Sequence, residues 1–220
     1  MKPRLLWAIA TGEMYAKVAR LTHPLMEAYA SRIGADFIAM REVDKKYPHP
    51  SWGKMGTYDF LEQYERVIYM DSDIVIRPDA PDLFALVPPD KLGALVENFV
   101  DAGRPQTVRD YFQANGWSLR GFDDAYFNAG LLITSQRHRA LFEDPGKYPD
   151  SMYEQTLLNG RRWNHGFPVH DLSQRVCAFV GRGQEDSAPF VHFAARFGDG
   201  LPELIRTKIL SMKGGPNDQA

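Results

Sequence analysis

The sequence predicts a single α/β domain in which helices cover a mainly parallel β-sheet. Short apolar segments alternate with longer segments of helical spacing along all 220 residues, and this alternation is typical of parallel sheets with helical connections. A chain of this length usually forms one domain, and no linker-like segment divides it. We therefore expect one folded domain over residues 1–213 and a disordered polar tail over residues 214–220.

Strands are predicted from short apolar runs, and helices from apolar residues that recur every three or four positions. The first strand, residues 5–10, is almost entirely apolar, as expected of a strand buried on both faces. The other predicted strands are 35–40, 66–70, 74–76, 92–96, 127–134, 176–180 and 189–193. The predicted helices are 15–33, 53–64, 106–114, 135–143, 151–162 and 202–212. Pro24 is expected to break or kink the first helix.

Composition excludes several classes of protein. Lys and Arg number 26 against 28 Asp and Glu, so a net charge of −2 argues against a general nucleic-acid binder. The single cysteine, Cys177, cannot form an internal disulfide and is expected in the core. The apolar run 5–10 is too short for a membrane span or a signal peptide. We therefore expect a cytoplasmic protein without a transmembrane segment or a nucleic-acid partner.

Two carboxylates stand at the carboxyl end of the predicted strand 66–70. Asp71 and Asp73 flank Ser72, and in extended backbone residues i and i+2 share one face. Ligands of open α/β sheets bind at the carboxyl ends of strands, and a divalent cation relieves repulsion between two carboxylates. The alternative is a solvated turn, because Asp and Ser are common turn residues.

One histidine, His192, lies within the predicted strand 189–193. As a third metal ligand beside Asp71 and Asp73 it would complete a site that suits Mn²⁺ better than Mg²⁺. The alternative is a hydrogen-bonded core histidine. Local spacing does not decide, because about 120 residues separate His192 from the two carboxylates.

Four motifs resemble, in their order, those of the glycogenin-type glycosyltransferases, family 8, which includes bacterial lipopolysaccharide galactosyltransferases. They are Lys54 followed by the strand that ends in Asp71-Ser72-Asp73, Phe-Asn-Ala-Gly at 127–130, Glu-Gln at 154–155 with Asn159, and Val-His-Phe at 191–193. The resemblance covers nearly the whole chain. It implies a single-domain GT-A (Rossmann-like) nucleotide-diphospho-sugar transferase fold, a nucleoside diphosphate sugar donor, most simply a UDP-sugar, and Mn²⁺ or Mg²⁺.

The resemblance also implies a role for each group of residues. The metal ligands would be Asp71, Asp73 and His192. The donor-binding residues would be Ala10, Thr11, Gly12, Tyr15, Lys54, Asp71, Ser72, Asp73 and Arg196. The residues around the transferred sugar and the acceptor would be Asn128, Glu154, Gln155 and Asp124.

Two positions depart from the family pattern. Glu154 replaces an Asp, and Gly198 stands where the family has a diphosphate-contacting Lys, for which Arg196 is the candidate substitute. The expected activity is metal-dependent transfer of a sugar from a nucleoside diphosphate sugar to a glycan or other hydroxyl acceptor. The alternatives are a sugar-nucleotide pyrophosphorylase, which residues 10–14 with their single glycine disfavour, and a non-catalytic carbohydrate-binding protein with a degenerate transferase fold. The sequence does not decide the sugar, the acceptor, the stereochemical outcome or the oligomeric state.

Overall fold

A computed structural model describes residues 2–121, 123–149, 153–196 and 198–213. The strands are β1 (Lys2–Ile9), β2 (Asp36–Met40), β3 (Tyr64–Met70), β4 (Ile74–Ile76), β5 (Leu92–Val96), β6 (Phe127–Ser135), β7 (Val169–Asp171), β8 (Cys177–Phe179) and β9 (Phe190–His192). The α-helices are α1 (Gly12–Arg32), α2 (Thr57–Gln63), α3 (Leu83–Leu86), α4 (Arg104–Ala114), α5 (Tyr153–His165), α6 (Ser173–Val176) and α7 (Leu201–Lys213). Two 3₁₀ segments are η1 (Pro50–Gly56) and η2 (Gln136–Phe142).

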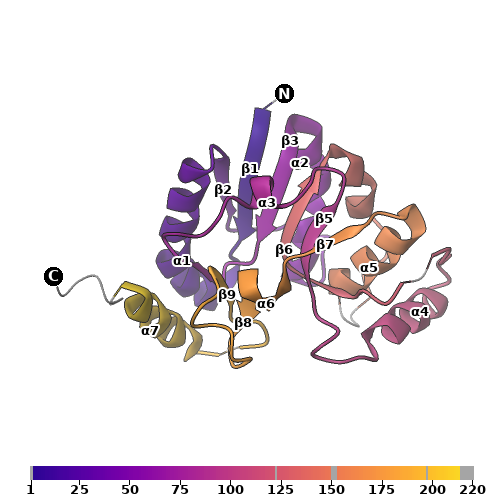
Figure 1. The fold of residues 1–220 in the computed structure, drawn as a ribbon. Coiled ribbons are helices and arrows are strands. Elements are labelled where there is room, and N and C mark those ends of the chain that lie inside the picture. Colours follow the sequence, from indigo (N-terminus) through magenta and orange to yellow (C-terminus); the bar gives the residue numbers. More distant parts are fainter. Residues whose placement is uncertain (1, 122, 150–152, 197, 214–220) are drawn as a thin grey trace.

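A six-stranded sheet in the order β2-β1-β3-β6-β5-β7 forms the centre of the molecule (Figure 1). Strand β1 is parallel to β2 and β3, and β5 is parallel to β7, whereas β6 runs antiparallel to both of its neighbours. The predicted mainly parallel sheet is confirmed, with β6 as the exception. Because β6 is reversed, its first residues lie at the same edge of the sheet as the last residues of β3 and β5.

A second sheet, β4-β9-β8, continues from that edge. Strand β4 begins directly after Asp73 and pairs antiparallel with β9, so that Ile74 lies opposite His192. The backbone N–H of Phe193 also donates to the carbonyl of Asp73 at 3.1 Å. This pairing brings together two segments that are far apart in the sequence.

The central sheet is covered on both faces, as the apolar character of its first strand predicts. Helix α1 packs against α7 on one side of the molecule, and α4 packs against α5 on the other (Figure 1). Within β1, Leu5 and Trp7 belong to one buried cluster, while Leu6 and Ala8 belong to a second cluster on the opposite face. Cys177 is buried in the second cluster, as expected.

Three expectations about local structure are wrong. Helix α1 continues through Pro24 without a break, at an exposed position where water can bind the backbone carbonyl that loses its N–H partner. The predicted helix 53–64 is divided into η1 and α2, and the predicted helix 135–143 is the 3₁₀ segment η2. The short elements α3, α6 and β7 have no periodic pattern long enough to predict them.

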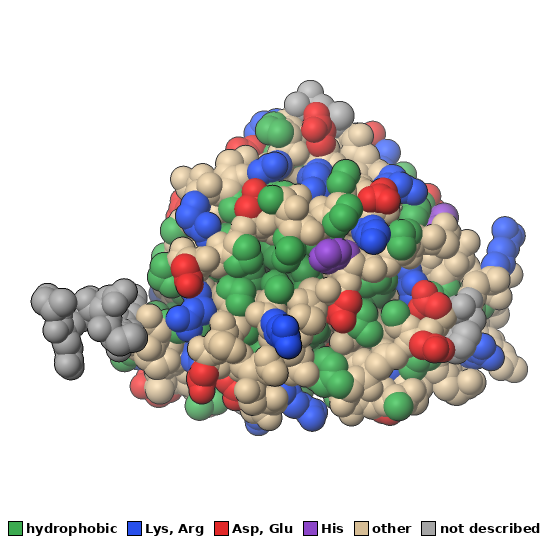
Figure 2. Space-filling view, in the orientation of Figure 1, with side chains coloured by type: hydrophobic (Ala, Val, Ile, Leu, Met, Phe, Trp, Pro, Cys, Tyr) green, Lys and Arg blue, Asp and Glu red, His purple; other side chains and the backbone are tan. Residues whose placement is uncertain are grey.

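The surface agrees with a nearly neutral chain. On the face shown in Figure 2, basic and acidic side chains are interspersed over the surface. Among the described residues, no helix is both long and apolar enough to cross a bilayer. The predicted tail, residues 214–220, lies outside the described residues, as do the first two residues of the predicted helix 151–162.

Candidate active site

Asp71, Asp73 and His192 converge at the edge where the two sheets meet. One ligand atom from each of the three side chains lies within 4.8 Å of the others. The Nε2 atom of His192 is 3.3 Å from Oδ1 of Asp73 and 3.7 Å from Oδ2 of Asp71. Strand β3 ends directly before Asp71, and β9, which carries His192, pairs with β4 directly after Asp73, so backbone pairing brings the three residues together.

This triad suits a divalent cation. Asp73 and His192 are 6% and 3% exposed, and Oδ1 of Asp73 has no hydrogen-bond partner among the described residues. A buried carboxylate oxygen without a donor is costly unless something positive binds it. Burial by itself lowers the pKa of His192, but attraction to Asp73 and Asp71 outweighs burial and raises the pKa overall. Two carboxylates and an imidazole form a donor set that transition metals such as Mn²⁺ accept.

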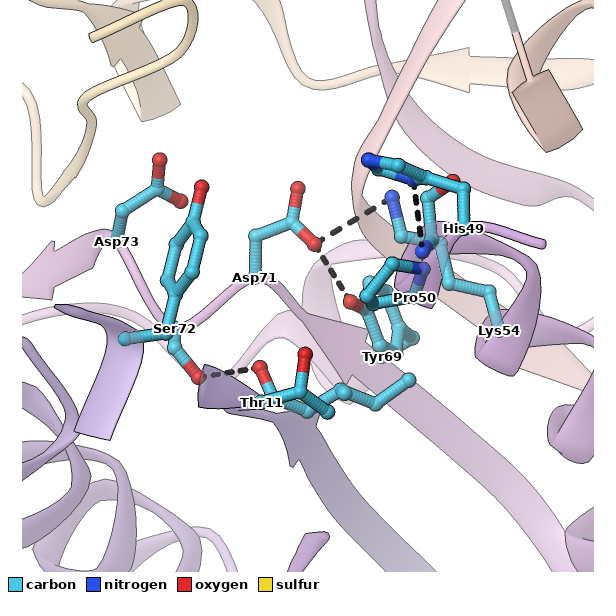
Figure 3. Close-up of a pocket in the computed structure, with 11 residues that line it drawn as sticks. Thr11, His49, Pro50, Lys54, Tyr69, Asp71, Ser72 and Asp73 are labelled. Carbon is cyan, nitrogen blue, oxygen red and sulfur yellow. Dashed lines mark hydrogen bonds and ion pairs between the residues drawn. The ribbon is translucent and has the colours of Figure 1, made fainter. Parts of the chain in front are cut away.

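Ser72 points away from the two carboxylates that flank it (Figure 3). Its hydroxyl donates to the backbone carbonyl of Ile9 at 2.7 Å and lies 2.8 Å from Nε2 of His23. Thr22 in turn donates to the backbone carbonyl of Ser72 at 2.7 Å. The side chain of Ser72 therefore fixes the turn between β3 and β4 and is not directed toward the two carboxylates.

A cavity of about 400 Å³, named here the Tyr15 cavity, lies on one side of the triad. Its lining includes Thr11, Tyr15, His49, Pro50, Ser51, Lys54, Tyr69, Asp71, Ser72 and Asp73. Burial, followed by the charges of Asp73 and Asp71, raises the pKa of Tyr15 to about 12, so its hydroxyl stays protonated. Ala10 and Gly12, both expected to contact the donor, instead line a separate cavity of about 600 Å³ with His23.

Lys54 is buried and its charge is already compensated. Its Nζ atom lies 2.7 Å from Oε1 of Glu154 and 3.4 Å from Oδ1 of Asp71. The hydroxyl of Tyr69 donates to the same Asp71 oxygen at 2.5 Å, as Figure 3 shows. Burial alone lowers the pKa of Lys54, but the two carboxylates raise it above its usual value. Lys54 thus holds Asp71 and Glu154 in place.

A second cavity, of about 420 Å³ and named here the Glu97 cavity, adjoins the triad through β6 and β9. Its lining is Glu97, Val100, Arg104, Asn128, Gln155, Phe179, Val180, Gly181, Arg182, Ala194, Ala195 and Arg196. Glu97 accepts hydrogen bonds from Asn128 at 3.0 Å and from Gln155 at 2.9 Å. Burial raises the pKa of Glu97, and these donors oppose the increase.

Gly130 lies between Asn128, which lines the Glu97 cavity, and the triad. A Cβ atom at residue 130 would collide with the His192 ring and would lie 2.7 Å from Oδ2 of Asp71 and 2.9 Å from Oδ1 of Asn128. The backbone N–H of Asp71 donates to the Gly130 carbonyl at 2.7 Å. Only glycine fits at this point, which shows that Asn128 lies beside the triad.

The other predicted site residues fall in different places. Gln155 lines the Glu97 cavity and also accepts from the backbone N–H of Ala129 at 2.9 Å. Glu154 is 3% exposed and faces Lys54. Asp124 lies in an exposed loop before β6 and lines neither cavity that flanks the triad. Arg196 lines the Glu97 cavity.

Sequence reasoning missed Glu97 and Tyr69. Glu97 directly follows β5, so it stands at the carboxyl end of a strand in the same way as Asp71 follows β3. The rule that singled out Asp71 predicts Glu97 when it is applied to the apolar run 92–96. Tyr69 lies within an apolar strand, where nothing in the pattern distinguishes its hydroxyl from that of a core tyrosine.

Comparison with known proteins finds a similarity to one family of glycosyltransferases. The model of the family described as "Glycosyl transferase family 8" matches residues 42–139, which include Lys54, the Asp71–Asp73 turn and Gly130. No curated protein sequence matches the chain.

Several solved structures have a similar fold. A glycosyltransferase involved in glycosylation of the major capsid of PBCV-1 has a TM-score of 0.61 and 15% identity over 93% of this chain and 99% of that one. The galactosyltransferase LgtC, in complex with donor and acceptor sugar analogs, has a TM-score of 0.59 and 15% identity over 96% of this chain and 95% of LgtC. GlyE of Streptococcus pneumoniae TIGR4 has a TM-score of 0.54 and 13% identity over 97% of this chain and 63% of GlyE.

The fold and the family match together define a glycosyltransferase with the GT-A fold. Within that class residues 42–139 match the family 8 model, in agreement with the resemblance of the four sequence motifs. At 15% identity the solved structures establish the fold alone, so donor, acceptor and metal require their own argument.

Proposed function

We propose that this protein transfers a sugar from a nucleoside diphosphate sugar, most simply a UDP-sugar, to a hydroxyl of a glycan or glycoconjugate with the help of a bound divalent cation. The observation that carries the proposal is the position of the Asp71–Asp73–His192 triad between two cavities. A nucleotide sugar has two parts joined by a diphosphate, and a metal at this point would lie beside the diphosphate.

The lining of each cavity suits a different part of the donor. The Tyr15 cavity offers the ring of Tyr15, the end of β1 at Ile9 and Thr11 at the start of α1, which suit a nucleoside. The Glu97 cavity offers a carboxylate and two amides, which suit the hydroxyls of a sugar. LgtC was solved with donor and acceptor sugar analogs, and this supports a hexose-like donor sugar and a sugar acceptor here.

The bound cation would supply positive charge to the diphosphate as the bond to the sugar breaks. Asp71, Asp73 and His192 would hold that cation, and Mn²⁺ fits their chemistry. Lys54 keeps the Asp71 carboxylate oriented and partly neutralised before the cation binds. The Asn128 and Gln155 amides, both fixed by Glu97, would bind the sugar hydroxyls and hold the anomeric carbon in line with the acceptor.

Two buried carboxylates, Glu154 and Glu97, lie near the amides of Asn128 and Gln155, and their surroundings differ. Glu154 is paired with Lys54 and does not line the Glu97 cavity. Glu97 is similarly buried but lines the cavity, where its carboxylate accepts from the Asn128 and Gln155 amides. We therefore assign contact with the sugar to Glu97 and a positioning role to Glu154.

Calorimetric titration with UDP, with and without Mn²⁺, tests the proposal. We expect UDP to bind in the presence of Mn²⁺ and to lose at least about tenfold in affinity without it, equivalent to about 1.4 kcal/mol. Slow Mn²⁺-dependent release of UDP from one UDP-sugar of a panel would separate an enzyme from a carbohydrate-binding protein. Turnover of a nucleoside triphosphate with a sugar 1-phosphate would support the pyrophosphorylase alternative instead.

A further inference from the structure

The loop after β8 is built so as to hold Arg182 in a fixed backbone position. Gly181 and Gly183, on either side of Arg182, have φ angles of 81° and 82°, a region that favours glycine. The Glu185 carboxylate accepts from the N–H of Gly181 at 2.9 Å and from the N–H of Gly183 at 2.7 Å. The N–H of Arg182 donates back to the Phe179 carbonyl at 3.3 Å.

A second tight turn places Arg196 beside this loop. The turn follows β9, where Ala195 has a φ of 58°, an uncommon value for a residue with a side chain. The N–H of Arg196 donates to the Phe193 carbonyl at 3.0 Å. An Nη2 atom of Arg196 lies 3.1 Å from where a Cβ of Gly181 would be, so the guanidinium rests against the Gly181 backbone. Arg196 and the Arg182 loop are therefore in contact.

These two cations differ from the other basic residues near the triad. Lys54 is paired with two carboxylates, and Arg104 lies 3.9 Å from Glu97 and Asp101. Within the part of the chain that the structure describes, neither Arg182 nor Arg196 forms an ion pair, and both line the Glu97 cavity. Two guanidinium groups at the rim of one cavity are suited to bind a phosphate group through paired hydrogen bonds.

We propose that Arg182 and Arg196 form a two-arginine clamp for the diphosphate of the donor, with Glu185 as the residue that positions Arg182. The proposal rests on the proposed function, because the diphosphate is placed by the triad. Strand β9 ends at His192, and Arg196 lies in the turn that follows, so the same segment carries a triad residue and an arginine of the clamp.

Titration with three probes separates this clamp from other roles. Inorganic pyrophosphate, UDP and uridine are each titrated with Mn²⁺ into the wild type and into Arg182→Ala, Arg196→Ala and the double variant. Arg206→Ala is the matched control, since Arg206 is an exposed arginine on α7 paired with Glu203. Glu185→Ala tests the positioning role, and thermal unfolding confirms that each variant is folded.

We expect each single arginine variant to weaken binding of UDP and of pyrophosphate about fivefold to tenfold, and the double variant more than either. Uridine binding and the Arg206→Ala control should stay within about twofold of the wild type. Glu185→Ala should weaken UDP binding about threefold without changing uridine binding, a pattern that a loss of folding would not produce. The affinity for UDP in the arginine variants should also depend less on salt concentration.

Two results would overturn the clamp even if the wild type binds UDP. One is a wild type that binds UDP with Mn²⁺ while both arginine variants bind UDP and pyrophosphate equally well, which leaves the proposed function standing. The other is an arginine variant that raises only the KM for the acceptor, which assigns the cations to an anionic acceptor. A wild type that binds pyrophosphate through the two arginines but does not bind UDP would support the clamp and contradict the proposed nucleotide. A wild type that binds neither would contradict both.

Discussion

The basic residues on the two sides of the triad differ in whether a carboxylate of the protein already pairs with them. Lys54, on the side of the Tyr15 cavity, is buried and lies between Glu154 and Asp71. Arg182 and Arg196, at the rim of the Glu97 cavity, are exposed and lie on two tight turns. A cation that holds the site together and a cation that binds substrate can therefore be distinguished by their partners, although the sequence presents both as isolated basic residues.

The largest expected effect comes from replacing Lys54, whose charge is compensated by Glu154 and Asp71. Lys54→Met leaves Glu154, which is 3% exposed, without its partner, so we expect a loss of about 3–5 kcal/mol in the free energy of unfolding. The double variant Lys54→Met with Glu154→Leu should recover most of that loss, because the uncompensated charge is gone. Urea denaturation of the metal-free protein measures both.

The matched substitution on the other side is Arg182→Ala, which should change the free energy of unfolding by less than about 0.5 kcal/mol. If Lys54→Met unfolds at the same urea concentration as Arg182→Ala, the distinction between the two kinds of cation is lost.

A comparison of two buried histidines sharpens the same point. His192 faces two carboxylates, which raise its pKa, whereas burial, with Arg137 and Arg66 nearby, lowers the pKa of His138 to about 4. His138 accepts a hydrogen bond from the Ser135 N–H at 3.1 Å through Nδ1, a contact that requires the neutral ring.

A lowered pKa in the folded state means that stability is complete above the unfolded value of about 6.5 and decreases as pH falls toward 4. From that difference we expect His138 to account for a loss of about 3 kcal/mol between pH 7 and pH 4. Thermal unfolding of the wild type and of His138→Gln across this range tests it. Parallel pH profiles for the two proteins would show that His138 does not titrate on unfolding.

At the Glu97 cavity we expect an effect on the transfer rate that is smaller than the losses of stability expected for Lys54→Met and for His138. Gln155→Ala removes an amide that binds Glu97 and Asn128, so we expect at least about tenfold slower transfer, equivalent to about 1.4 kcal/mol of barrier. Binding of UDP should stay within about twofold, because Gln155 does not line the Tyr15 cavity. Gln113→Ala, at an exposed position on α4, is the control. Transfer at the wild-type rate in Gln155→Ala would show that α5 does not contact the transferred sugar through Gln155.

Much of the fold was accessible from the sequence, because the strands of the central sheet are apolar runs with clear ends. The strand 92–96 is observed with its predicted bounds, and the runs before Asp71 and around His192 are strands as expected. The direction of β6 was not accessible, since a buried strand has the same pattern in either direction. That direction nevertheless decides that Asn128, near the start of β6, lies beside Asp71.

The site was predictable where it follows backbone pairing and unpredictable where it depends on side-chain partners. Convergence of Asp71, Asp73 and His192 was inferred from a family resemblance, and the β4–β9 pairing is its physical cause. The buried pairing of Lys54 with Glu154 joins residues 100 positions apart, and no local pattern contains it. Glu97 was within reach of the strand-end rule but was not singled out.

The central claim is that the triad binds a divalent cation together with a nucleoside diphosphate. The most direct test is a crystal structure with Mn²⁺ and UDP, with diffraction data recorded at the manganese absorption edge. We predict one strong anomalous peak in contact with Asp73 and His192, with the uracil in the Tyr15 cavity and the diphosphate directed toward the Glu97 cavity. An anomalous peak elsewhere, or UDP bound with His192 still contacting only the two carboxylates, would contradict the account.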